Sequence, residues 1–268
     1  MSSVHRIAAV QMVSGPDVAA NLAAAERLIG EAAAAGAGLV VLPEYFPLIT
    51  ADETAKLRLC EPDGEGPLQA FLQDAARRHG VWLIGGTIPL AGSDPGRVKN
   101  AILVFDDTGQ RVARYDKIHL FGFRKGAEQY NESATIAPGH AATAFDADGF
   151  RVGLSICYDL RFPELYRSLG ACDLLVVPAA FTETTGRAHW EILLRARAIE
   201  NQCYVLAIGQ GGRHENGRET HGNSMLVDPW GTILDRKLKG PGIVIGDVDP
   251  AFIADTRASL PALQHRVL

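Results

Sequence analysis

The sequence predicts an α/β protein with mixed sheets, and three observations agree on this class. Short apolar runs of strand length alternate with longer segments of helical periodicity along the whole chain. Two of the strand-like runs flank the turn Asp107-Thr108-Gly109, which predicts an antiparallel hairpin that a purely parallel sheet would lack. Neither a linker nor a composition break divides the sequence, so we expect residues 1–268 to form one domain.

The first half of the chain opens with a predicted β-α-β unit. A strand at 7–12 is followed by an Ala-rich amphipathic helix at about 18–35 and by an apolar strand at 38–46. A second helix is expected at 68–79. The strands expected after this helix lie at 81–88, 101–106 and 110–115.

The second half repeats this alternation. Its expected helices lie at 162–169 and 187–201. Its expected strands lie at 152–156, 174–177 and 203–208, and near Met225 and Val244.

Composition excludes several classes of function. With 268 residues and 47% hydrophobic composition, the chain can bury a large core. Its net charge of −5, without long runs of one sign, gives no basic surface for nucleic acid. The sequence contains neither a signal-peptide pattern nor a membrane-spanning run, so we expect a cytoplasmic protein without a membrane partner. The four cysteines lack metal-ligand spacing, and we expect no metal and no cofactor.

One cysteine stands where a nucleophile is expected. Cys157 ends the apolar run 152–156 and immediately precedes a predicted helix start. A tight turn after a strand holds a side chain out at the sheet edge, and the backbone N–H groups that follow face a developing anion. The pattern predicts attack of the thiol on an acyl carbon.

Two charged residues also follow predicted strands. Glu44 ends the run that starts at Gly38, and Lys117 follows the second strand of the predicted hairpin. Strand ends are where open α/β sheets place their sites. A thiol needs a base, and the oxyanion that its attack creates needs a fixed positive charge, so Glu44 and Lys117 are assigned these two roles.

The segments around these residues, LPEYF, YDKIHLF and SICYDLRFPEL, resemble in this order the Glu, Lys and Cys motifs of the nitrilase (carbon–nitrogen hydrolase) superfamily. Segments 178–191, 194–205 and 260–266 are similar to its Nit branch. The resemblance implies a four-layer α-β-β-α sandwich of two mixed sheets, and a homodimer or higher homo-oligomer. It also implies a small-molecule amide as substrate, which is cleaved at the C–N bond through a thioester.

The resemblance also assigns roles to individual residues. Glu44 would be the general acid and base, and Lys117 would depress the thiol pKa and stabilise the oxyanion together with the N–H of Tyr158. A second glutamate of the family lies six residues before a Pro-Gly pair, which matches Glu132 and would make it the residue that positions Lys117 or water.

Substrate contacts are expected near the same motifs. Arg161 follows Cys157 by one helical turn and is a candidate clamp for a carboxylate, although core packing or an ion pair with Glu164 explains it equally well. His119 offers a rival Cys–His pair, but a structural histidine is the commoner outcome. The aromatic residues expected to wall the pocket are Tyr45, Phe121, Phe123 and Phe181.

Three functions therefore stay open. The first is an amidase acting on a linear, carboxylate-bearing amide, either deaminated glutathione or an ω-amido 2-oxo acid; segments 211–214 and 223–231 are more similar to the deaminated glutathione amidases. The second is a nitrilase or an N-carbamoyl amide hydrolase. The third is a non-catalytic interaction protein, against which the intact set Glu44, Lys117, Glu132 and Cys157 counts.

Overall fold

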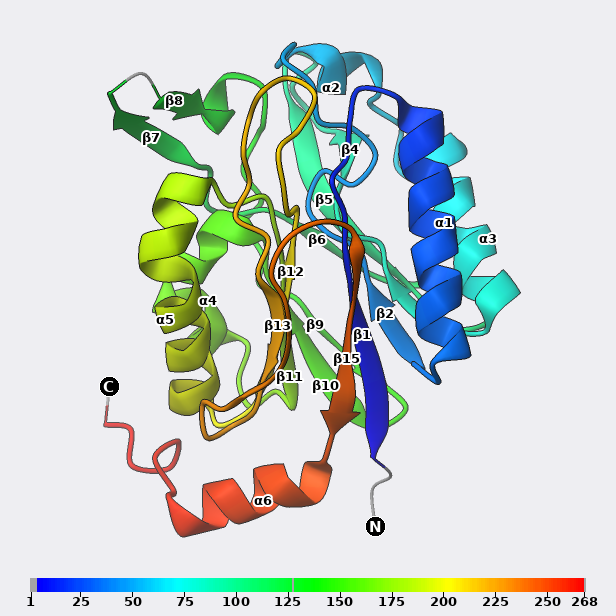
Figure 1. Cartoon of the computed structure of the whole chain (residues 1–268). Helices are drawn as coiled ribbons and strands as arrows, with labels where there is room; N and C mark the ends of the chain where they lie inside the picture. The colour runs from blue at the N-terminus through cyan, green and yellow to red at the C-terminus, as the bar shows by residue number, and fades with distance from the viewer. Residues whose placement is uncertain (1–3, 127, 268) are drawn as a thin grey trace.

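The computed structural model of the chain describes residues 4–126 and 128–267 as a sandwich of four layers (Figure 1). Helices α1 (Val18–Ala34) and α3 (Pro67–His79) cover one sheet, and α4 (Pro163–Ser168) and α5 (Glu183–Asn201) cover the other. The two sheets face each other between these helices. The predicted α/β class and the four-layer arrangement of mixed sheets are confirmed.

The first sheet has seven strands in the order β15-β1-β2-β3-β5-β4, with β6 also paired to β5. Strands β1, β2 and β3 are parallel, whereas β15 and β5 are antiparallel to their neighbours. The predicted hairpin is present as β5 and β6. The bounds are β1 His5–Gln11, β2 Leu39–Val41, β3 Trp82–Ile84, β4 Ile88–Ala91, β5 Val98–Phe105, β6 Arg111–Asp116 and β15 Gly242–Val248.

The second sheet has six strands in the order β14-β13-β12-β11-β10-β9, and its three central strands are parallel. A separate hairpin of β7 (Gly122–Lys125) and β8 (Glu128–Asn131) projects beyond the sandwich at the top of Figure 1. The bounds of the second sheet are β9 Ala144–Ala147, β10 Phe150–Leu154, β11 Leu174–Ala179, β12 Tyr204–Gly209, β13 Ser224–Val227 and β14 Ile233–Lys237.

Side-chain alternation along the strands of the first sheet places neighbouring residues in different layers of the core. In β2, Val41 belongs to the cluster between the two sheets, and its neighbour Val40 belongs to the cluster under α1 and α3. Both residues are fully buried. Because both faces of this sheet are covered, its parallel strands are apolar throughout, as the sequence pattern predicted.

The expected strand at 81–88 is two strands, β3 and β4, which pair with successive parts of β5. Gly86 interrupts it with a φ of 53°, and a Cβ there would overlap the carbonyl oxygen of Pro43. Only glycine combines this conformation with so close an approach. The helix α2 (Ala55–Arg58), the helix α6 (Pro250–Ser259) and strands β7, β8, β9 and β14 were not predicted, because they are short or polar.

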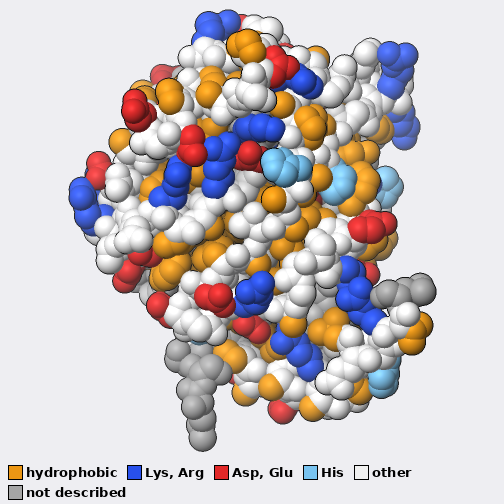
Figure 2. Space-filling view, turned by 180° about the vertical axis from the view of Figure 1, so that it is seen from behind, with side chains coloured by type: hydrophobic (Ala, Val, Ile, Leu, Met, Phe, Trp, Pro, Cys, Tyr) orange, Lys and Arg blue, Asp and Glu red, His pale blue; other side chains and the backbone are white. Residues whose placement is uncertain are grey.

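The surface carries charges of both signs. On the face shown in Figure 2, basic and acidic side chains are interspersed, with hydrophobic side chains between them. None of the helices within the described residues combines the length and the apolar character that crossing a bilayer requires.

Candidate active site

Three of the predicted residues meet beyond the ends of different strands. Glu44 follows β2, Lys117 follows β6 and Cys157 follows β10. The Lys117 Nζ lies 2.9 Å from Glu44 Oε1 and 2.7 Å from Oε2 of Glu132, which starts a 3-10 helix after β8. Cys157 and Glu44 line the same cavity. Four side chains that are far apart in the chain therefore form one cluster.

Cys157 has a strained backbone. Its φ is 48°, in the left-handed region that non-glycine residues rarely adopt. It is the first residue of a 3-10 helix, Cys157–Arg161, whose leading N–H groups lack partners within the helix. The side chain is 7% exposed and faces a cavity. The turn thus presents the thiol beside the backbone N–H groups at the start of this helix, including that of Tyr158.

Both oxygens of Glu44 accept hydrogen bonds. Oε1 accepts from Lys117 and, at 3.0 Å, from the Asn100 side chain in β5. Oε2 accepts at 2.8 Å from the backbone N–H of Ala180, the first residue after β11. The next residue, Tyr45, has a φ of 56°, and its N–H donates to the Thr87 hydroxyl. The carboxylate is fully buried and held by both sheets.

Glu132, like Glu44, is held by several hydrogen bonds. It accepts from the Tyr45 hydroxyl at 2.8 Å and from the Phe121 N–H at 2.7 Å, besides its bonds to Lys117. The Gly139 N–H donates to the Lys117 carbonyl at 2.7 Å, and a Cβ on Gly139 would overlap the carbonyl oxygen of Asp116. The Pro-Gly pair that located Glu132 in the sequence therefore packs against the lysine segment.

The cluster carries one excess negative charge when both glutamates are ionised. Burial raises the pKa of Glu44 above its ordinary value, and the charge of Glu132 adds to this effect. Burial alone would lower the pKa of Lys117, but the two carboxylates raise it above its ordinary value. Burial opposes ionisation of Glu132 as well, yet Lys117 and the hydrogen bonds lower its pKa. Glu44 is thus the more basic carboxylate when Lys117 is charged.

The thiol pKa differs from the sequence-based expectation. Burial raises the pKa of Cys157 well above its ordinary value, and the charge of Glu44 raises it further. Lys117 acts in the predicted direction, downward, but its effect is smaller than that of burial. Burial and the charge of Glu44 therefore both favour the protonated thiol, and Glu44, which lines the same cavity, can take its proton as the sulfur attacks.

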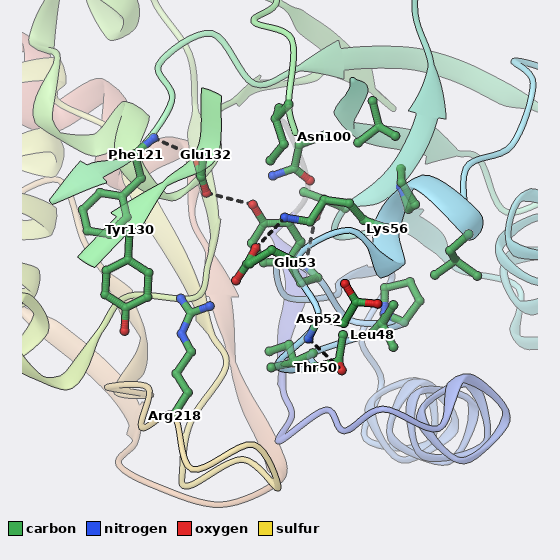
Figure 3. Close-up of a pocket in the computed structure, with 18 of the residues that line it drawn as sticks. Leu48, Thr50, Asp52, Glu53, Lys56, Asn100, Phe121, Tyr130, Glu132 and Arg218 are labelled. Carbon is green, nitrogen blue, oxygen red and sulfur yellow. Dashed lines mark hydrogen bonds and ion pairs between the residues drawn. The ribbon is translucent and has the colours of Figure 1, made fainter. Parts of the chain in front are cut away.

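Two cavities adjoin at this cluster. The inner cavity is lined by Cys157 and Glu44 together with Thr182, and the larger outer cavity is shown in Figure 3. Hairpin β7–β8 contributes Tyr130 to the outer wall. The residues that line both cavities are Tyr45, Phe121, Glu132 and Arg218.

Most of the expected pocket residues line the inner cavity. Tyr45, Phe121, Arg161 and Phe181 are among them, as is Tyr158. Phe123 lines neither cavity and instead stacks on Phe121, with ring centroids 5.9 Å apart. Phe123 therefore contacts a residue that lines the cavity but does not itself line it.

Arg161 borders the inner cavity through its guanidinium. This group lies over the rings of Tyr158 and Phe181, at 5.7 Å and 5.4 Å, and one nitrogen lies 3.1 Å from Nδ1 of His189. Within residues 4–126 and 128–267, Glu164 forms no salt bridge with it. The ion-pair explanation is thus not supported, and Arg161 remains a candidate to bind a carboxylate in this cavity.

The partner of His119 is Asp159, and not Glu44 or Glu132. Its Nδ1 lies 2.7 Å from Asp159 Oδ1, which also accepts from the His119 N–H at 3.0 Å. Its ring stacks on Phe162 with centroids 3.7 Å apart. His119 does not line the inner cavity. These contacts describe a structural histidine and do not support a Cys–His pair.

Several supporting residues were missed from the sequence. Asn100 and Asp159 are buried and polar within apolar segments, a signal that could have marked both. Asp159 also accepts from the Tyr115 hydroxyl at 2.7 Å and from the Ile156 N–H at 2.9 Å. The backbone donor at Ala180 has no signal in the sequence, because its side chain takes no part in the contact.

The other cysteines lie outside the cluster. Cys172 and Cys203 are buried, and burial raises the pKa of Cys172 to about 11. Cys60 is half-buried and its pKa is also raised by burial. No group of three or more His, Cys, Asp or Glu side chains in the described part of the chain could hold a metal ion.

Comparison with known proteins gives consistent matches. Residues 6–258 match the family described as carbon-nitrogen hydrolase. The deaminated glutathione amidase of Synechocystis sp. is 44% identical over 97% of both chains. Nit3 of Saccharomyces cerevisiae, described as a member of branch 10 of the nitrilase superfamily, has a TM-score of 0.88 with 30% identity, over 100% of this chain and 98% of that one. The C. elegans NitFhit protein also has a TM-score of 0.88, with 36% identity over 99% of this chain and 66% of that one.

Proposed function

Because the chain belongs to the carbon–nitrogen hydrolase family, we propose that it is an amidase whose substrate is deaminated glutathione. One observation carries this proposal: the buried cluster of Cys157, Glu44, Lys117 and Glu132 lies under an inner cavity that adjoins a larger one. The 44% identity with a deaminated glutathione amidase supports the choice of substrate. We take residues 1–268 as one catalytic domain, and the match over residues 6–258 supports this.

The first half of the reaction forms a thioester. The Cys157 sulfur attacks the amide carbonyl carbon while Glu44 takes the thiol proton. The Lys117 ammonium and the Tyr158 N–H stabilise the oxyanion. The C–N bond then breaks, and Glu44 gives its proton to the departing nitrogen of cysteinylglycine. Glu132 positions Lys117 through two hydrogen bonds at 2.9 Å and 2.7 Å.

The second half hydrolyses the thioester. Glu44, ionised again, takes a proton from water as the water oxygen attacks the acyl carbon. The C–S bond breaks, the 2-oxo diacid leaves, and the Cys157 sulfur regains its proton. The carboxylate of the 2-oxo acid lies against Arg161, whose guanidinium suits a carboxylate. Tyr45, Phe121 and Phe181 wall the acyl chain.

The test compares three substrates at equal enzyme concentration. Deaminated glutathione is expected to give the highest kcat/KM, measured as release of cysteinylglycine. An ω-amide of a 2-oxo acid and a simple nitrile are measured as release of ammonia. A preference for the ω-amide would make the enzyme an ω-amidase, and a preference for the nitrile would make it a nitrilase. Turnover of none of them would favour the non-catalytic alternative.

The pH profile of kcat/KM is expected to report Glu44. The base must be ionised, so the rate falls as the pH drops through the pKa of Glu44, which burial raises above its ordinary value. The acid limb should therefore lie above the value of about 4.3 for a free glutamate. No rise is expected near the free-thiol pKa of about 8.5, since Glu44 removes the proton during attack. A limb at or below the ordinary carboxyl value would contradict this assignment.

We also propose that the enzyme is a homodimer. Exposed apolar side chains gather on α5 and on the segment after β13, where Gly231 packs against Ile199. Such a patch marks an interaction surface, and a second copy can cover it symmetrically. Light scattering is expected to give the mass of two chains, and Ile192→Glu should halve it. A wild-type monomer would contradict the proposal. The patch consists of Ile192, Ile199, Trp230, Leu234 and Leu238.

A further inference from the structure

Arg218 lies where the inner and outer cavities meet, and it lines both. One of its terminal nitrogens donates to the Ala180 carbonyl at 3.0 Å, and its guanidinium lies 5.1 Å from the centre of the Tyr130 ring. Its Nε is buried and has no hydrogen-bond partner among the described residues. In the part of the chain that the structure describes, its contacts are thus a carbonyl oxygen and an aromatic ring, without a carboxylate.

These contacts use only part of the hydrogen-bonding capacity of the Arg218 guanidinium. A guanidinium stays charged and carries five N–H donors in a planar fork that matches a carboxylate. Figure 3 shows the Arg218 guanidinium pointing between Tyr130 and Glu132 into the outer cavity. The other cation of that cavity, Lys56, is already paired with Glu53 at 2.8 Å and bonded to Thr135 at 3.2 Å. Of these two cations, Arg218 is therefore the one whose N–H donors are available to a ligand in the outer cavity.

The two cavities suit the two halves of a peptide-like amide. Cys157 and Arg161 both line the inner cavity, so the acyl chain and its terminal carboxylate are assigned to it. The leaving group must then extend toward the outer cavity, which is the larger of the two. An extended dipeptide spans about 7 Å. The backbone of Ala180 is hydrogen-bonded to both Glu44 and Arg218, so only one residue separates the glutamate from the guanidinium. A leaving dipeptide is therefore long enough to bring its terminal carboxylate to Arg218.

We propose that Arg218 determines specificity by binding the terminal carboxylate of the leaving dipeptide in the outer cavity. This inference rests on the proposed function and adds the reason why the enzyme prefers a peptide amide. An ω-amide releases ammonia, leaves the outer cavity empty and makes no use of Arg218. The preference therefore comes from the leaving group, while both substrates share the acyl subsite and the cluster around Cys157.

The test pairs a variant with a modified substrate. Arg218→Gln is expected to lower kcat/KM for deaminated glutathione by about 10- to 100-fold, the effect of losing a charge-assisted bond. For the ω-amide of the same 2-oxo acid the loss should be below about threefold. Wild-type enzyme should lose a similar factor when the terminal carboxylate of deaminated glutathione is converted to an amide, and Arg218→Gln should lose little more on that substrate. The modified substrate tests the contact even if the variant folds poorly.

The matched control is Arg213→Gln, which removes an exposed arginine from the same loop and should leave both rates unchanged. If wild-type enzyme does not cleave deaminated glutathione, the proposed function fails and this inference fails with it. If wild-type enzyme cleaves it but Arg218→Gln affects both substrates equally, or neither, only the inference fails. The same holds if the wild-type rate ignores the terminal amide.

Discussion

Cys157→Ala is expected to lower kcat/KM by about 10⁴-fold or more, because members of a nucleophile–base unit act together and removing the nucleophile stops the covalent route. The variant should stay folded. Alanine removes only the buried sulfur, whose ionisation the site already disfavours. Alanine also keeps the Cβ, so the left-handed backbone conformation at this position is no more strained than in the wild type. Steady-state assays on deaminated glutathione and a urea unfolding curve measure both effects.

Trapping the intermediate makes this prediction sharper. Acid quenching during turnover, followed by mass spectrometry of peptides, should find the acyl group on the peptide that contains Cys157. Cys60→Ala is the matched control, since that half-buried thiol lies outside the cluster and its loss should leave the rate unchanged. Full activity of Cys157→Ala, or an acyl adduct on another residue, would show that the nucleophile has been misassigned.

Lys117→Met is expected to reduce both activity and stability. The rate should fall by about 10²- to 10³-fold or more, because the oxyanion loses its fixed positive charge. The free energy of unfolding should fall by about 3–5 kcal/mol, because Glu44 and Glu132 would be left buried without their shared partner. Lys125→Met, at an exposed position of β7, is the matched control and should change neither quantity.

The pH dependence separates this effect from a simple loss of packing. Without Lys117, the pKa values of both glutamates should rise above their unfolded values, so the folded variant binds protons more readily than the unfolded chain. Its stability deficit should therefore be smaller at pH 5 than at pH 8 in urea unfolding. The double variant Lys117→Met with Glu132→Gln should recover part of the stability and none of the activity. A deficit that does not depend on pH would contradict the electrostatic explanation.

The residues at the strand ends show which parts of the candidate site local sequence patterns can predict. Cys157 and Glu44 follow apolar runs and Lys117 follows a hairpin strand, and the general placement of sites at strand ends was enough to group them. Glu132 lies after a polar hairpin that no pattern predicted, and only the family resemblance pointed to it. Local patterns did not identify Asn100 or the Ala180 N–H as partners of Glu44, because both come from segments that are distant from Glu44 along the chain.

The sequence by itself determined the alternating α/β plan, the mixed sheets and the three residues at the strand ends, because each of these depends on a local period or on a short motif. Only the tertiary structure decided which way Phe123 faces, that His119 serves Asp159, and that Arg218 stands between two cavities. It also decided that burial raises the pKa of the Cys157 thiol. A pKa depends on burial and on distances between charges, and the order of residues along a chain contains neither quantity.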